Sequence, residues 1–149
     1  MSAIRKSIVI DRSPEDVYSY LTDSTHLPEW QDSAVSAVPM DDLPVHVGSK
    51  VLVTRKIGKR RIPTTMEFTE LDPPRSWHVH GVDGPVRPDV RGTIEPLDGG
   101  TRSRVTLAVD FEGHGMGRAL VPLVVKPMVR KEMPRGEEKL KHLLEHTAA

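Results

Sequence analysis

The sequence predicts an α+β fold, in which a curved antiparallel sheet of seven strands wraps around one long C-terminal helix, with two short helices after the first strand. Three observations predict it. A β-rich segment at residues 3–11 is followed at once by a helix-start signal. Residues 33–112 place apolar side chains at alternate positions between turn residues. From residue 116 onward, apolar residues recur at helical spacing. A sheet buries the apolar face of so long a helix only by curving around it.

The N-terminal elements follow from local signals. Residues 3–11, AIRKSIVID, are typical of a strand. Ser13 can cap a helix, Pro14 has the preset φ that suits a first helical position, and two acidic residues follow to complement the positive helix end. A second short helix is expected over residues 25–31, THLPEWQ, which carry Trp30.

The middle of the chain is typical of a meander of strands. Expected strands cover residues 35–39, 49–57, 61–71, 76–82, 90–94 and 105–111. The run Asp98-Gly99-Gly100 is a strong hairpin signal between the last two. Consecutive strands joined by tight turns imply an antiparallel sheet with one solvated face.

One long helix is expected from about Met116 to His146. Leu120, Leu123, Val124 and Met128 would turn its apolar face toward the sheet. Pro127 and Pro134 lie inside this segment, and each removes a backbone donor, so we expect a kink or a break.

Composition narrows the function classes. The 149 residues hold 21 Lys+Arg and 21 Asp+Glu, and this balance argues against a broad electrostatic nucleic-acid surface. The lack of cysteine excludes disulfides, thiol catalysis and thiolate metal sites. The N-terminal segment resembles neither a signal peptide nor a membrane span, so we expect a cytoplasmic protein, monomer or dimer. Aromatic residues form only 4% of the chain, and few bulky side chains remain to fill the interior.

A curved sheet around a helix with few large side chains predicts a cavity for an apolar small molecule. Strand alternation and helical spacing turn the candidate ligand-binding residues inward: Trp30, Val53, Arg55, Met66, Phe68, Trp77, Val79, Ile94, Leu107, Leu120, Val124 and Met128. Val51, Thr64, Val90, Val105 and Val109 share that phase, and either Tyr18 or Trp30 is expected near the rim. Plain core packing explains each apolar member equally well. A buried Arg55 would need a carboxylate or a ligand anion as its partner.

Other chemistry-bearing residues have simpler explanations. His78 and His80 share one strand face, but that face is opposite Trp77 and no third ligand is apparent, so no metal site is expected. No nucleophile motif is present, and we assign no catalytic residue and expect no cofactor. The basic run at residues 55–61 is typical of a solvated hairpin tip, and the alternative is docking to an acidic partner, an anionic lipid or RNA.

The chain resembles the START/polyketide cyclase superfamily, also called SRPBCC or helix-grip, in its small bacterial branch. The segments that carry the resemblance are SIVIDRSPEDVYSYLTD with HLPEW, FTELDPPRSW, IEPLDGGTRSRVTL and EEKLKHLLE, in this order along nearly the whole chain, taken as one domain over residues 1–149. The resemblance implies an internal cavity for lipids, polyketides or other apolar ligands, but no shared catalytic residue.

Three functions stay open at this point. The chain is a binding protein for a hydrophobic small molecule, a cyclase or dehydratase that uses acid–base groups in its pocket, or a lipid or quinone carrier or protein-interaction module. Several buried polar groups in the cavity would favour the enzyme, a dry cavity would favour carriage, and a filled interior would favour the interaction module.

Overall fold

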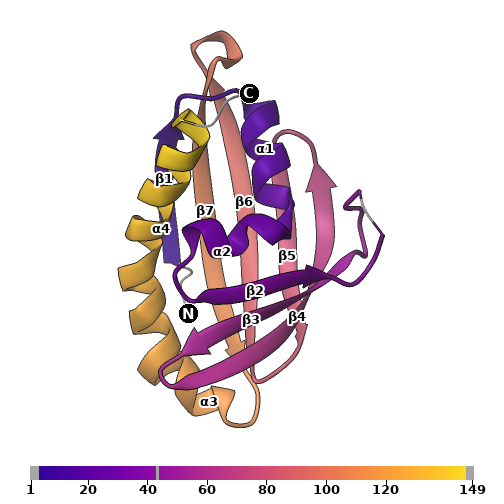
Figure 1. Ribbon diagram of the computed structural model, residues 1–149, viewed down its shortest axis with the longest axis vertical. Coiled ribbons are helices and arrows are strands. Elements are labelled where there is room, and N and C mark those ends of the chain that lie inside the picture. Colours follow the sequence, from indigo (N-terminus) through magenta and orange to yellow (C-terminus); the bar gives the residue numbers. More distant parts are fainter. Residues whose placement is uncertain (1–3, 43, 147–149) are drawn as a thin grey trace.

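The sheet has seven strands, and every neighbouring pair is antiparallel. The computed structural model describes residues 4–42 and 44–146, so Ala3 of the predicted first strand lies outside the described residues (Figure 1). The strands run in the order β1-β7-β6-β5-β4-β3-β2. Their bounds are β1 Ile4–Ile10, β2 Ala34–Pro39, β3 Lys50–Ile57, β4 Arg60–Asp72, β5 Ser76–Asp83, β6 Val86–Leu97 and β7 Arg102–Gly113. The predicted α+β architecture is confirmed.

Short helices fill the chain between β1 and β2. Helix α1 spans Pro14–Thr22, and the Ser13 hydroxyl accepts a hydrogen bond from the Asp16 backbone N–H at 3.3 Å, as a capping serine does. A 3₁₀ turn at Ser24–His26 leads into α2, Leu27–Trp30. Both predicted helices are therefore present, the second as two shorter pieces.

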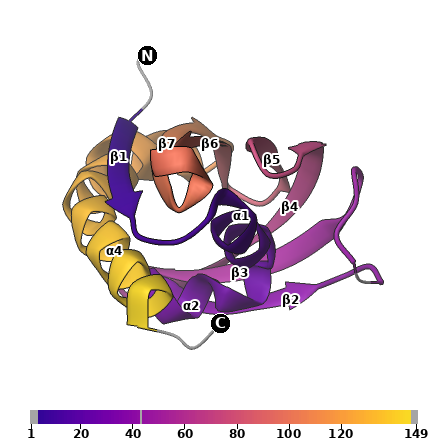
Figure 2. The ribbon, with the colours of Figure 1, turned by 90° about the horizontal axis from the view of Figure 1, so that it is seen from above.

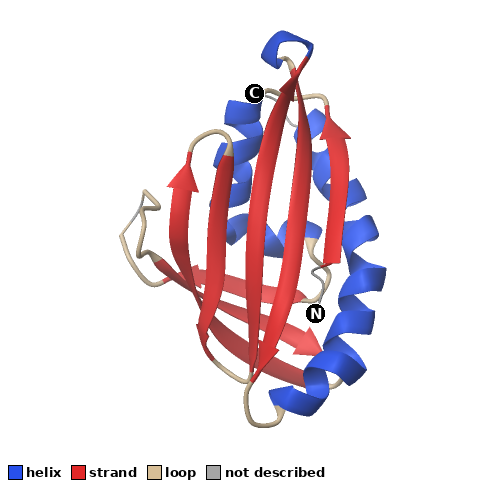
Figure 3. Cartoon of the chain, turned by 180° about the vertical axis from the view of Figure 1, so that it is seen from behind, coloured by secondary structure: helices blue, strands red, loops and turns tan. Residues whose placement is uncertain are grey.

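The sheet curves into a half-barrel that α4 (Lys126–His146) helps to close. Seen from above, the strands follow an arc from β1 through β7 and β5 to β3 and β2, and α4 lies across the gap between the two ends (Figure 2). Seen from behind, the helices lie on the far side of the sheet from the viewer (Figure 3). The concave face thus looks inward toward α4, and the convex face looks outward.

The C-terminal helix is one continuous helical run with a π turn inside it. Helix α3 spans Gly117–Leu120, the π turn spans Val121–Val125, and α4 follows directly. Pro127 comes just after the π turn, where the helix has already widened, and Pro134 lies within α4 without ending it. The predicted break is therefore absent from this segment, and its irregularity takes the form of a π turn.

One end of the interior is solid core. Here α1 packs on β6 and β7. Tyr18 is only 6% exposed, and its ring meets Trp77 edge to face at a centroid distance of 5.9 Å. Of the two residues expected near the rim, Tyr18 is therefore not there, because α1 turns it into the core. The buried residues around it include Ile10, Val17, Leu21, Ile94, Val105, Leu140 and Leu144.

No helix in residues 4–42 and 44–146 has the length and apolar character needed to cross a membrane.

Candidate ligand-binding cavity

A cavity of about 150 Å³ lies between the concave face of the sheet and α4. Nine of the twelve predicted residues line it: Trp30, Val53, Arg55, Met66, Phe68, Trp77, Val79, Leu107 and Met128. An apolar cavity of this size holds benzene or xenon in an engineered protein, whereas sites for drug-sized ligands span roughly 300–1,000 Å³. The cavity as it stands therefore fits a molecule of about one ring.

Alternation along the strands builds the sheet side of the wall. On β3, Val51, Val53, Arg55 and Ile57 line the cavity, whereas Leu52 between them is 36% exposed on the other face. The same period of two continues on β4 with Ile62, Thr64, Met66 and Phe68. Because the alternation is regular, the position of a residue along its strand was enough to predict that most of these side chains face the cavity.

The Trp77 indole lies against Gly92 on the neighbouring strand β6. The two residues are register partners, and a Cβ at position 92 would overlap the Trp77 indole ring. Trp30 approaches α4 in a similar way, since a Cβ at Gly136 would come within 3.0 Å of the Trp30 carbonyl oxygen. Both tryptophans of the chain thus line the cavity, each beside a glycine.

The helix side of the wall is a stripe along α4 and the end of the π turn. Its members are spaced three and four residues apart: Val125, Met128, Val129, Glu132, Met133, Gly136 and Glu137. The stripe is apolar except for two carboxyl groups. Neither group was predicted to face the cavity, although Glu132 is four residues from Met128, and Glu137 is four from Met133 and three from Leu140, which is the spacing of one helix face.

One polar end of the cavity is a cluster of Arg55, Ser33 and Glu132. The Arg55 guanidinium donates a hydrogen bond to the Ser33 hydroxyl at 3.1 Å, and the Ser33 backbone N–H donates to Glu132 Oε1 at 2.7 Å. Burial lowers the pKa of Arg55, and the nearby charge of Glu132 opposes that shift. The carboxylate partner that a buried Arg55 requires is thus present, and the arginine side chain still faces the cavity.

Glu137 has a different environment. It is 5% exposed, and its Oε2 has no hydrogen-bond partner among the described residues. Burial raises the pKa of this carboxyl group to about 7. A carboxylic acid that is neutral near physiological pH can donate a hydrogen bond as well as accept one.

Three predicted wall residues lie elsewhere. Ile94 lies in the solid core beside α1. Alternation along a strand predicts which face of the sheet a residue is on, but not how far along the strand the cavity extends. Leu120 and Val124 pack at the periphery of a cluster around Ile57, Val121 and Val125. Val121 and Val125 are the buried residues of the π turn, whereas Leu123 is 75% exposed.

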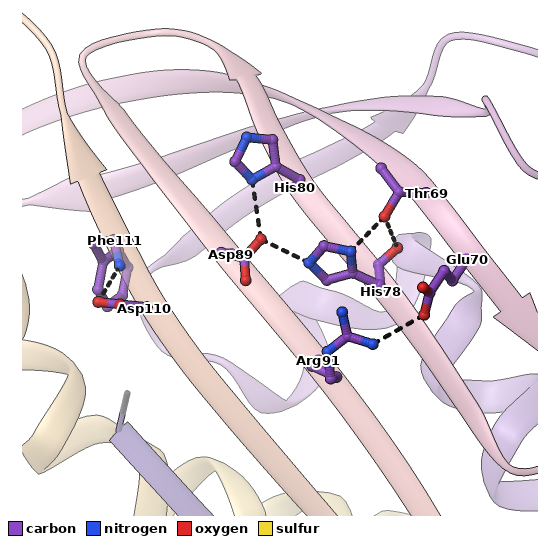
Figure 4. A network of polar contacts seen from close by, with 8 residues as sticks. All are labelled: Thr69, Glu70, His78, His80, Asp89, Arg91, Asp110 and Phe111. Atoms are coloured by element: carbon purple, nitrogen blue, oxygen red, sulfur yellow. Dashed lines mark hydrogen bonds and ion pairs between the residues drawn. The ribbon is translucent and has the colours of Figure 1, made fainter. Parts of the chain in front are cut away.

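A histidine network occupies the outer face of the sheet. Asp89 Oδ1 lies 2.6 Å from His78 Nε2 and 3.0 Å from His80 Nδ1, and Thr69 Oγ1 lies 2.5 Å from His78 Nδ1 (Figure 4). Arg91 pairs with Glu70 beside it at 2.9 Å. Across residues 4–42 and 44–146, no group of three His, Cys, Asp or Glu side chains has the geometry of a metal site. Neither His78 nor His80 lines the cavity, as predicted from their position on the strand face opposite Trp77.

A family model described as polyketide cyclase/dehydrase and lipid transport matches residues 1–145. The chain belongs to this family. The match confirms the resemblance noted in the sequence. No curated protein matches the chain.

Solved structures similar to this family member show the same fold at low sequence identity. A protein from Thermus thermophilus has a TM-score of 0.76 and 16% identity, covering 95% of this chain and 96% of its own. A START superfamily protein from Mycobacterium smegmatis has a TM-score of 0.71 and 18% identity, covering 97% and 95%. The Zhui aromatase/cyclase from a Streptomyces species has a TM-score of 0.73 and 15% identity, covering 96% and 93%.

Proposed function

We propose that this protein binds a small, largely apolar molecule in the cavity between the sheet and α4. The observation that carries the proposal is the hollow of about 150 Å³ in an otherwise packed interior. Protein interiors are packed about as densely as organic crystals, so a void of this size forfeits contacts that a ligand would restore. Its wall is mainly apolar with a few polar groups, which is the usual composition of a small-molecule site.

Intrinsic fluorescence offers a direct test, because the two tryptophans of the chain both line the cavity. Titration with a one-ring apolar compound is expected to change the emission and to saturate at one equivalent. A Val53→Phe variant should fill part of the space and weaken binding at least ~10-fold, which corresponds to about 1.4 kcal/mol. Leu52→Phe is the matched control, since Leu52 is the next residue on the same strand and faces outward. Equal binding by both variants would overturn the proposal.

The natural ligand can be sought by native mass spectrometry of the protein purified from cells. We expect a co-purifying compound of low mass, present with the wild-type chain and reduced with Val53→Phe.

An acid–base enzyme of the cyclase or dehydratase type is the second candidate. It is favoured by the polar groups in the wall, Arg55 and Glu137 above all, because such chemistry needs a titratable group within reach of the substrate. Turnover of a poly-β-carbonyl compound, followed by mass spectrometry of the products, tests it. Loss of turnover in Glu137→Gln with retained binding would support the enzyme, and no turnover by the wild-type chain would remove it.

Carriage of a lipid or quinone and a cytoplasmic location are further proposals, consistent with the lipid transport named in the family description. A long acyl chain would require the cavity to expand beyond the present volume. Transfer of a labelled lipid between vesicles tests the first proposal, and cell fractionation tests the second.

A further inference from the structure

Glu137 is a buried carboxyl group in the cavity wall with an unused hydrogen-bonding atom. It is 5% exposed, it lines the cavity, and its Oε2 has no partner in residues 4–42 and 44–146. Leaving a buried polar atom unpaired costs free energy that folding must offset elsewhere. A ligand that supplies the missing partner would recover that free energy on binding.

Glu132 is the other carboxyl group in the cavity wall, and unlike Glu137 it has a hydrogen-bond partner in the fold. It lies on the same helix stripe, but its Oε1 accepts the Ser33 backbone N–H at 2.7 Å, and its charge acts on Arg55. Glu132 thus ties α4 to the start of β2, and its charge balances that of the partly buried Arg55. Glu137 Oε2 has no hydrogen-bond partner of this kind in the described residues, so hydrogen bonding within the fold does not explain why this carboxyl group is buried.

The surroundings of Glu137 favour its neutral form. Met133 and Leu140 lie on the same face of α4, and Gly136 brings Trp30 against the helix. Burial raises the pKa of Glu137 to about 7. The charge of Lys6 on β1 opposes this rise and that of Glu138 adds to it. At slightly acidic pH the group therefore carries a proton and presents an O–H donor to an apolar cavity.

We propose that Glu137 is the polar anchor of the ligand, donating a hydrogen bond to a carbonyl or similar acceptor oxygen on a molecule of about one ring. The ligand class is thereby narrowed from any apolar compound to an oxygenated one. This inference rests on the proposed binding function. Arg55 also offers donors to the cavity, but its guanidinium stays charged across the neutral pH range, so pH separates the two groups.

The test compares two compounds of nearly equal shape, acetophenone and α-methylstyrene, which differ in having C=O or C=CH₂ at one position. Calorimetry of the wild-type protein at about pH 6 is expected to show roughly 5-fold tighter binding of the ketone, the effect of about one hydrogen bond. At about pH 8.5 the carboxylate can no longer donate, and the preference should disappear.

Variants assign the preference to one residue. Glu137→Gln keeps an N–H donor that does not titrate, so its preference for the ketone should persist at both pH values. Glu137→Leu should lose the preference at both pH values and still bind α-methylstyrene. Glu138→Gln, at the exposed neighbour, is the control and should retain the preference at pH 6.

The outcomes separate the two proposals. Equal binding of both compounds by the wild-type protein at pH 6 would overturn the role of Glu137 and leave the cavity as a binding site. A preference that survives unchanged at pH 8.5 and in Glu137→Leu would also overturn it and would point to Arg55. Failure of the wild-type protein to bind either compound would overturn the proposed function itself.

Discussion

Gly92 shows how a single residue shapes the cavity. It lies opposite Trp77 on the neighbouring strand, and a Cβ there would overlap the indole ring. We expect Gly92→Ala to lower the free energy of unfolding by about 2 kcal/mol, as overpacking of a core does. Urea unfolding measures the change, and Arg91→Ala on the outer face of β6 is the control, with a change within about 0.5 kcal/mol. An unchanged stability for Gly92→Ala would mean that the indole is free to move away.

Glu137 also makes stability depend on pH. Its pKa is about 7 in the folded chain against an ordinary value of 4.5, so the folded state holds a proton that the unfolded state releases between these values. Its contribution is fully present below pH 4.5 and is lost as the pH rises through 7. The difference, 7 − 4.5, corresponds to roughly 3 kcal/mol.

Glu137→Gln removes this titration. The wild-type protein should therefore lose stability relative to Glu137→Gln between pH 5 and pH 8, as measured by urea unfolding at both values. A constant difference between the two proteins across that range would show that the carboxyl group titrates normally.

Single residues also show what the sequence could and could not predict. Val53, Met66 and Trp77 were placed correctly because strand alternation is strict and turn residues mark the strand ends. Glu137 was overlooked because a charged residue in a helix normally faces water, and only its spacing from Met133 and Leu140 marked it as inward.

At the scale of elements, the order of the strands was predictable, and their bounds were predicted in part, since the expected residues 90–94 cover only the middle of β6. The buried face at the start of the last helix was not predicted. The expected strand at 61–71 differs by one residue at each end from β4, Arg60–Asp72. The predicted helix face turned Leu120 and Val124 toward the sheet, whereas Val121 and Val125 are the buried residues of this segment, which forms a π turn. Such a turn depends on packing across the whole interface, which a local pattern does not contain.

Pro134 gives a test at this scale. It lies inside α4 on an exposed position, where it removes a backbone donor and crowds the preceding turn. Pro134→Ala is expected to raise the free energy of unfolding by about 2 kcal/mol, since proline is roughly 3 kcal/mol less favourable than alanine in a helix interior. Thermal and urea unfolding measure this, and a loss of stability would indicate that the chain needs the local distortion that proline imposes.

At the scale of the whole molecule, the hollow follows from shape and composition together. The interior is packed where α1 lies on β6 and β7, and a hollow remains between the sheet and α4, although both Trp and both Phe of the chain line it. The low aromatic content of the sequence predicted a cavity, but its place and extent depend on how the sheet curves around α4.

A crystal structure under xenon pressure shows whether the cavity is hollow, because xenon enters apolar cavities of this size. Xenon density is expected inside the half-barrel, in contact with Trp77, Met66 and Met128. An interior filled by side chains, with no xenon bound, would contradict the presence of this cavity.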